Sequence, residues 1–90
     1  MMAATFFKDP AALLDFAVEW AAWLGDDTIS AAGWTVPAGL TKEAESATAT
    51  KATVWLAGGT AGQSYEVVNH IVTAGGREDE RTLVIRCVER

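Results

Sequence analysis

The strongest constraint on the fold is a pair of alternating segments, residues 64–74 and 81–89, that a glycine pair joins. Successive side chains of a β-strand point to opposite faces, so apolar and polar residues that alternate over this length predict two strands. Gly75-Gly76 is a turn dipeptide that permits positive φ at both central positions, which suits a tight reversal of the chain. The sequence therefore predicts a β-hairpin here, with the acidic residues 78–80 at a solvated tip.

The segments before this hairpin are rich in Thr and Val and are punctuated by Gly, a composition typical of strands. Residues 28–36 are β-prone, and residues 51–57 alternate as a half-buried strand does. Residues 41–50 are polar and Ala-rich, and we expect an exposed connection or a weak edge strand there. Strands at this spacing, with turn signals between them, predict an all-β fold, an immunoglobulin-like antiparallel β-sandwich.

Tyr65 stands at the start of the long strand, just after the glycines of residues 58–62. This is the position of a tyrosine corner, whose hydroxyl group bonds back to the upstream backbone. The alternative is a partly buried tyrosine without that hydrogen bond, and the sequence leaves both possibilities open.

Residues 10–24 permit two predictions. Asp9 followed by Pro10 is a strong helix start, with the carboxylate as N-cap and the proline at the first helical position. One helical face would then carry Leu13, Phe16, Ala17, Trp20 and Leu24. The same stretch also alternates as a strand, with Leu14, Phe16, Val18 and Trp20 on one side and Asp15, Ala17 and Glu19 on the other. Periodicity alone favours the helix slightly, which would give an α+β fold with an N-terminal helix at about residues 10–24.

Composition limits the domain count and the classes of partner. Half of the 90 residues are apolar, but many of these are Ala, so the large apolar side chains suffice for one small core. We expect a partly ordered leader at residues 1–9 and a single domain at residues 10–90. The net charge is −5, and the acidic excess lies in the first fifty residues. A chain without a basic stripe predicts neither a nucleic-acid partner nor a membrane partner.

Few residues have the spacing that catalysis or metal binding requires. His70 is the only histidine and lacks the partners of a catalytic triad, so we interpret it as a surface strand residue. Cys87 is the only cysteine; it cannot form an internal disulfide, which favours folding in a reducing cytosol, and we interpret it as a small buried hydrophobe. The acidic pairs and triplets have no calcium-loop spacing. The sequence thus predicts no catalytic residue, no metal, no cofactor and no enzymatic activity.

The four tryptophans divide into two groups. Trp20, Trp23 and Trp34 flank the first strands and are expected to fill the core. Trp55 points outward if its neighbours in residues 51–57 point inward. The outward positions of the following strands hold valines, namely Val68, Val72, Val84 and Val88. An apolar patch of this kind predicts a protein interface built from Trp55 and these valines. The alternative places Trp55 in the core and treats the valines as ordinary β-formers.

An ordered series of stretches resembles one family of small bacteriophage virion proteins, the phage fiber-tail adaptor proteins. The stretches are KDP at residues 8–10, LDFAVEW at 14–20, WLGDDTI at 23–29, WTVPAGL at 34–40, ATVWLAGG at 52–59, YEVVNHIVT at 65–73 and GREDERTLVIR at 76–86. The resemblance covers roughly residues 8–90. It implies an immunoglobulin-like domain in the phage particle, and it favours a strand over a helix within residues 10–24.

The resemblance also implies a function. We expect a structural component of the virion, an adaptor in the tail or neck region that acts by protein–protein packing. Its partners would be other tail, neck or fiber proteins, with several copies in a symmetric assembly put together in the bacterial host cytoplasm. The alternative is an immunoglobulin-like module that binds carbohydrate or a host surface. The loop at residues 58–62 offers few polar side chains for such a site.

Overall fold

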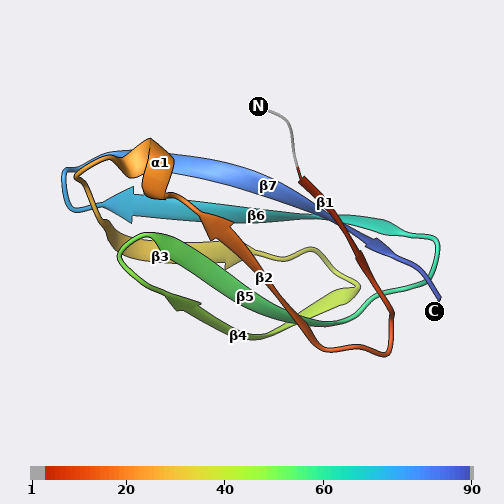
Figure 1. Cartoon of the computed structure of the whole chain (residues 1–90). Coiled ribbons are helices and arrows are strands. Elements are labelled where there is room, and N and C mark those ends of the chain that lie inside the picture. The colour runs from red at the N-terminus through yellow and green to blue at the C-terminus, as the bar shows by residue number, and fades with distance from the viewer. Residues whose placement is uncertain (1–3, 90) are drawn as a thin grey trace.

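The computed structural model describes residues 4–89 as two β-sheets packed face to face (Figure 1). The molecule is elongated, with principal extents of 41 × 25 × 19 Å. The elements, in chain order, are β1 (Ala4–Lys8), β2 (Leu14–Glu19), α1 (Ala21–Leu24), β3 (Ile29–Thr35), β4 (Leu40–Ala47), β5 (Lys51–Gly58), β6 (Ser64–Thr73) and β7 (Glu78–Cys87).

One sheet has the strand order β1-β7-β6-β3 and the other the order β2-β5-β4. In an immunoglobulin sandwich the second, fifth and fourth strands form one sheet, and the third, sixth and seventh strands form the other. The observed order agrees with this arrangement and confirms the predicted all-β sandwich. One pair is not antiparallel: β1 leaves the sheet of β2 and runs parallel to β7, with Ala4 opposite Leu83 and Lys8 opposite Cys87.

The predicted hairpin is present, because β6 and β7 pair antiparallel from Ser64 opposite Arg86 to Val72 opposite Glu78. Its turn is shorter than expected, and only Gly76 of the glycine pair adopts a positive φ, of 87°. The strand β7 therefore begins at Glu78. The prediction that residues 78–80 form the tip is wrong, because they continue the pairing with β6, although Glu78 and Glu80 are exposed as expected.

The helix at about residues 10–24 is not formed, and the strand is correct. In β2 the side chains of Phe16 and Val18 are buried, while Asp15 and Glu19 are exposed. Asp9 caps a turn instead of a helix: its carboxylate accepts a hydrogen bond from the N–H of Ala11 at 2.8 Å. The only helix of the described residues, α1, is one turn long, and it is not long and apolar enough to cross a membrane.

Side chains from both sheets build one core. The buried apolar residues include Trp20 and Trp34, as predicted, whereas Trp23 is only partly buried against the core. A buried polar bridge links the sheets: Trp20 Nε1 donates to Asn69 Oδ1 at 2.8 Å, and Asn69 Nδ2 donates to the carbonyl oxygen of Gly33 at 3.0 Å. The oxygen and the nitrogen of the Asn69 side-chain amide thus each have a partner, so the burial of this polar side chain is compensated.

The strand β1 occupies part of the expected leader, whose first three residues lie outside the described residues. Lys8, at its end, is fully buried. Its Nζ donates to the carbonyl oxygens of Asp9 at 2.9 Å and of Gly58 at 2.7 Å. Phe6 packs on Phe16 of the other sheet, with ring centroids 5.5 Å apart. β1 therefore joins the two sheets at one side of the sandwich.

The corner before β6 has the geometry of a tyrosine corner. Tyr65 Oη accepts a hydrogen bond from the backbone N–H of Thr60 at 3.0 Å, which confirms the first of the two possibilities for this residue. The ring also lies against Gly39, where a Cβ would approach Tyr65 Cε1 to 2.7 Å. Gly39 thus leaves room for the tyrosine ring between two connections.

Candidate protein interface

Trp55 lies on the outer face of the β2-β5-β4 sheet. Its side chain is 40% exposed, while Val54 and Leu56 on either side of it in β5 are fully buried. The predicted outward direction of Trp55 is therefore correct. The strand register places Asp15 of β2 on one side of Trp55 and Ala44 of β4 on the other. Because alanine is small, the indole has no bulky side chain between it and solvent on the β4 side.

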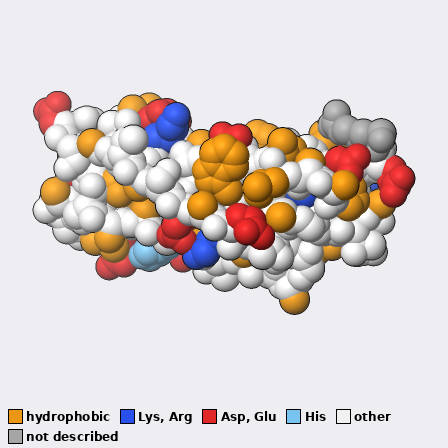
Figure 2. Space-filling view, turned by 90° about the horizontal axis from the view of Figure 1, so that it is seen from below, with side chains coloured by type: hydrophobic (Ala, Val, Ile, Leu, Met, Phe, Trp, Pro, Cys, Tyr) orange, Lys and Arg blue, Asp and Glu red, His pale blue; other side chains and the backbone are white. Residues whose placement is uncertain are grey.

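One exposed leucine extends this apolar surface. Leu13 is 52% exposed and stands two residues before Asp15, the cross-strand partner of Trp55. Leu14 is 38% exposed, but it lies opposite the buried Leu56 and so belongs to the inward side of β2. We call the surface of Leu13, Asp15, Ala44 and Trp55 the Trp55 face. Figure 2, which looks at the molecule from below, shows hydrophobic side chains gathered in the middle of this side with acidic side chains beside them. Sequence reasoning missed Leu13 because the helical pattern assigned it to a buried face.

The carboxylates of the β2-β5-β4 sheet are only partly neutralised. On β4, Glu45 lies opposite the buried Val54 and forms an ion pair with Lys42. On β2, Glu19 accepts a hydrogen bond from the N–H of Ala21 at 3.1 Å. Asp15 has no hydrogen bond or ion pair with any described residue. An exposed indole therefore stands beside a carboxylate that residues 4–89 do not pair.

The four predicted valines lie on the other sheet, and we call their surface the valine face. Val68 and Val72 belong to β6, Val84 to β7, and Val88 follows β7. All four are half-buried. The structure does not bring them together with Trp55, so the prediction of one shared face is wrong. That prediction assumed that the strand of Trp55 neighbours β6, whereas β5 pairs with β2 and β4.

His70 lies on the valine face between two carboxylates of β7. Its Nδ1 is 3.1 Å from Glu80 Oε2, and its Nε2 is 3.0 Å from Glu78 Oε1. The hydrogen bonds to Glu80 and then to Glu78 raise the pKa of His70 above its ordinary value of 6.5. These partners were not predicted, because the second strand of the hairpin was expected to begin at residue 81, whereas its pairing with β6 begins at Glu78. Within the described part of the chain, no group of three His, Cys, Asp or Glu side chains is arranged to hold a metal ion.

Two arginines stack on tryptophans at one end of the sandwich. The Arg77 guanidinium lies 4.3 Å from the Trp23 ring centroid, and its Nη2 is 3.2 Å from Asp27 Oδ2. Hydrogen bonds to the Asp27 carboxylate, first from the Thr73 side chain and then from backbone N–H groups and Arg77, lower the pKa of Asp27 to about 2. The contact is thus a three-part unit of indole, carboxylate and guanidinium.

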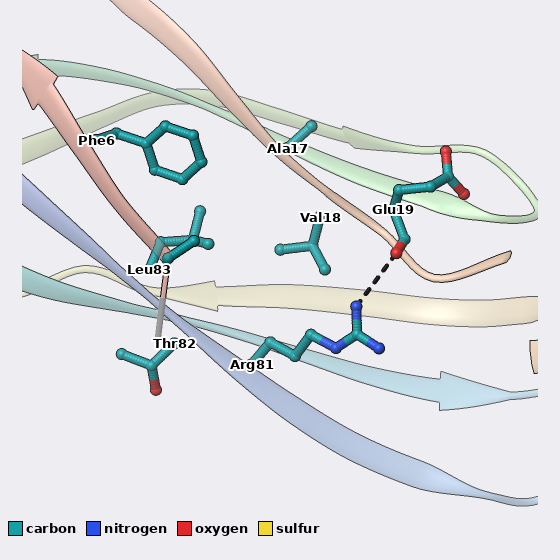
Figure 3. A pocket seen from close by; sticks show the side chains of 8 residues that line it. Phe6, Ala17, Val18, Glu19, Arg81, Thr82 and Leu83 are labelled. Atoms are coloured by element: carbon teal, nitrogen blue, oxygen red, sulfur yellow. Dashed lines mark hydrogen bonds between the residues drawn. The ribbon is translucent and has the colours of Figure 1, made fainter. Parts of the chain in front are cut away.

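A hollow of about 360 Å³ lies at the side of the sandwich where β1 and β7 face β2 (Figure 3). Arg81 closes one end of it: Nη1 donates to the carbonyl oxygen of Glu19 at 3.2 Å, and the guanidinium lies 4.2 Å from the Trp20 ring centroid. The lining residues are Ala4, Phe6, Ala17, Val18, Glu19, Arg81, Thr82 and Leu83. The walls are mainly apolar and hold no nucleophile next to a base, so this space offers no catalytic chemistry.

Cys87 is fully buried next to the end of β5, with Sγ 4.0 Å from the carbonyl oxygen of Gly58. This agrees with its interpretation as a small buried hydrophobe. In the loop of residues 58–62, Thr60 is tied by Tyr65 and by Gln63, whose N–H donates to the Thr60 carbonyl oxygen at 3.0 Å. The loop glycines therefore act as turn residues, and Gly59 lies directly against the Cys87 side chain.

No curated protein matches the chain. Residues 8–86, however, match a protein family described as podophage GP4 fiber-tail adaptor protein gp77. The match runs from the buried Lys8 almost to the end of β7, so it covers both sheets and all strands after β1 nearly in full. The chain therefore belongs to the podophage GP4 fiber-tail adaptor protein gp77 family.

Proposed function

We propose that this chain is a structural adaptor of a phage virion that links a fiber to the tail or neck by protein–protein packing and performs no catalysis. The observation that carries the proposal is the family match over residues 8–86. The structure supplies surfaces that suit the role: an exposed indole on one outer face and a row of half-buried valines on the other. An adaptor must hold two neighbours at once, and the opposite faces of one rigid sandwich can do this.

The dimensions of the molecule are sufficient for this role. A stable interface buries about 800 Å² on each partner. The two larger extents of the sandwich, 41 and 25 Å, give each face enough area for one such contact. Trp55 is the natural centre of the first contact, because tryptophans dominate the binding energy of many interfaces. The second contact would use Val68, Val72, Val84 and Val88.

Repetition would strengthen these contacts. Several copies around the particle axis would hold a fiber through many linked contacts, which increases the overall affinity without any new interaction. The acidic excess of the first fifty residues, together with the carboxylate of Asp15, which no residue of 4–89 pairs, favours a basic surface on the neighbour of the Trp55 face.

The proposal is tested by placing one variant on each face, Trp55→Ala and Val84→Asp, in the phage and determining the protein composition of purified particles by mass spectrometry. A variant that breaks the contact toward the tail removes both the adaptor and the fiber. A variant that breaks the contact toward the fiber removes the fiber alone. We expect the two variants to give these two different outcomes.

Circular dichroism and urea unfolding of both purified variants provide the control for folding. The exposed Asp26→Asn, in the connection between α1 and β3, serves as a neutral substitution and should leave the particles complete. Particles of normal composition for both folded variants would overturn the assignment of these faces. If both variants lose the same proteins, the proposal of two separate contacts is wrong.

A further inference from the structure

The described residues contain one complete unit of indole, carboxylate and guanidinium, at Trp23, Asp27 and Arg77. The arginine stacks on the ring and bonds to the carboxylate at the same time. Such a combination uses both properties of the guanidinium, its flat cationic face and its fork of N–H donors. This chain thus contains an example of an arginine that binds a neighbouring tryptophan and aspartate at the same time.

The Trp55 face holds the first two parts of the same unit. Trp55 and Asp15 are direct cross-strand partners on one face of an antiparallel pair, where Cβ atoms are about 5 Å apart. The indole is 40% exposed, and Asp15 has no hydrogen bond or ion pair within residues 4–89. The third part, a guanidinium, is missing from the described surroundings of this pair.

The chain cannot readily supply this arginine itself. Its arginines are residues 77, 81, 86 and 90, all in or next to the last strand, and the two described ones nearest α1 already stack on Trp20 and Trp23. The strands β2, β4 and β5 contain none. The lysines of this sheet are Lys42, which pairs with Glu45, and Lys51, which lies opposite Glu19.

We propose that Trp55 and Asp15 form a docking site for an arginine side chain of the virion protein that contacts the Trp55 face. The guanidinium stacks on the indole and donates to the Asp15 carboxylate, while apolar residues beside the arginine cover Leu13. This inference rests on the proposed adaptor function and adds the chemistry of the partner. Arginine is favoured over lysine because an ammonium group cannot stack as a plane and bind a carboxylate in a bidentate manner.

The test uses the whole chain and three capped tripeptides, Leu-Xaa-Leu, in which Xaa is arginine, lysine or citrulline. Citrulline keeps the planar group but lacks the charge. The readout is the indole N–H signal of Trp55 in heteronuclear NMR spectra, assigned with Trp55→Phe. We expect the arginine peptide to shift this signal most, the lysine peptide less and the citrulline peptide hardly at all. Asp15→Asn should weaken the binding of the arginine peptide about tenfold, because it removes a charge-assisted hydrogen bond.

Asp26→Asn is the matched control, since it makes the same change at another exposed aspartate and should leave the binding unchanged. Equal shifts with arginine and citrulline, or full binding by Asp15→Asn, would overturn the inference.

Particles distinguish this inference from the function on which it rests. If Trp55→Ala particles lose a neighbour and Asp15→Asn particles are complete, the Trp55 face docks a partner but the arginine site is wrong. If both variants lose the same neighbour, the inference is supported. If neither does, both the docking of this face and the arginine site are wrong. Self-association of the chain that Trp55→Ala abolishes would identify a second copy as the occupant and would likewise contradict the proposal.

Discussion

The two outer faces of the sandwich are built by the same alternation of side chains, yet they differ in how their charges are satisfied. On the valine face, His70 lies between Glu78 and Glu80, and the apolar side chains are half-buried. On the Trp55 face, the indole is exposed and Asp15 beside it has no partner among the described residues. The valine face is thus largely satisfied within the chain, whereas the Trp55 face offers both an apolar and a charged group to another molecule.

This difference shows that the outward residues of a strand can be assigned to a surface only when its hydrogen-bonded neighbouring strands are known. Trp55 and Val68 are both outward residues of long alternating strands. They belong to opposite sides of the molecule because β5 pairs with β2 and β4, while β6 pairs with β3 and β7. Membership in a sheet, and not distance along the chain, decides which side chains can form one surface.

The largest effect on stability is expected when the hydrogen-bonded bridge between the two sheets is removed. Asn69→Ala leaves Trp20 Nε1 and the Gly33 carbonyl oxygen without their partner in the core. We expect the free energy of unfolding to fall by about 3 kcal/mol, because each unsatisfied buried group costs about 1–3 kcal/mol. Urea unfolding measures this change. A loss below about 1 kcal/mol would mean that the core relaxes or admits water to satisfy both groups.

A smaller loss is expected where β1 joins the sheets. Lys8→Met removes the two hydrogen bonds from Nζ to the carbonyl oxygens of Asp9 and Gly58, with little change in side-chain volume. We expect a loss of about 2 kcal/mol in the free energy of unfolding. Lys51→Met, at an exposed position, is the control and should change it by less than about 0.5 kcal/mol. An unchanged stability for Lys8→Met would show that burying the ammonium group costs as much as its hydrogen bonds return.

A cation added within the chain would give the charge on the Trp55 face an internal partner, as the valine face already has. Ala44→Arg places a guanidinium on β4 directly opposite Trp55. We expect a gain of about 0.5 kcal/mol in stability, typical of an exposed cation–π contact. The same variant should no longer bind the arginine peptide, because its own arginine occupies the indole. Thr35→Arg adds the same charge to the other sheet and should bind the peptide normally. Unchanged binding by Ala44→Arg would contradict the stacking geometry.

The smallest effect concerns the pH dependence of the valine face. Because the pKa of His70 is raised in the folded state, its contribution to stability is fully present below pH 6.5 and is lost as the pH rises through the folded value. The difference in stability between the wild type and His70→Gln should therefore shrink with rising pH. NMR titration should show that Glu80→Gln lowers the pKa of His70 more than Glu78→Gln does. The reverse order would mean that Glu78 is the stronger partner.

Much of the fold follows from local patterns. Alternation identified the hairpin of β6 and β7 and the strand β5. Polar, Ala-rich composition indicated the exposed character of β4, and the glycines before Tyr65 indicated its corner. The region of residues 10–24 was ambiguous because alanines fit both a helix and a strand. The burial of Phe16 and Val18 between two sheets decides in favour of the strand, and this is tertiary packing that periodicity does not contain.

The candidate interface was less predictable. The outward direction of Trp55 followed from its strand, but its neighbours Asp15 and Ala44 come from the pairing of β5 with β2 and β4. The exposure of Leu13 depends on where β2 begins. The burial of Lys8 depends on β1 joining a distant strand, because a lysine in a leader is ordinarily solvated. Each of these features arises from contacts between residues far apart in the sequence.

The parallel pairing of β1 with β7 has a consequence for how the molecule is made. The residues that complete the sheet beside Ala4–Lys8 belong to β7, so β1 waits for its partner until all the strands between them have been synthesised. Until then the backbone of β1 has no strand to pair with. A chain cut short before β7 therefore keeps an open sheet edge and lacks Val84 and Val88, two of the four valines of the valine face.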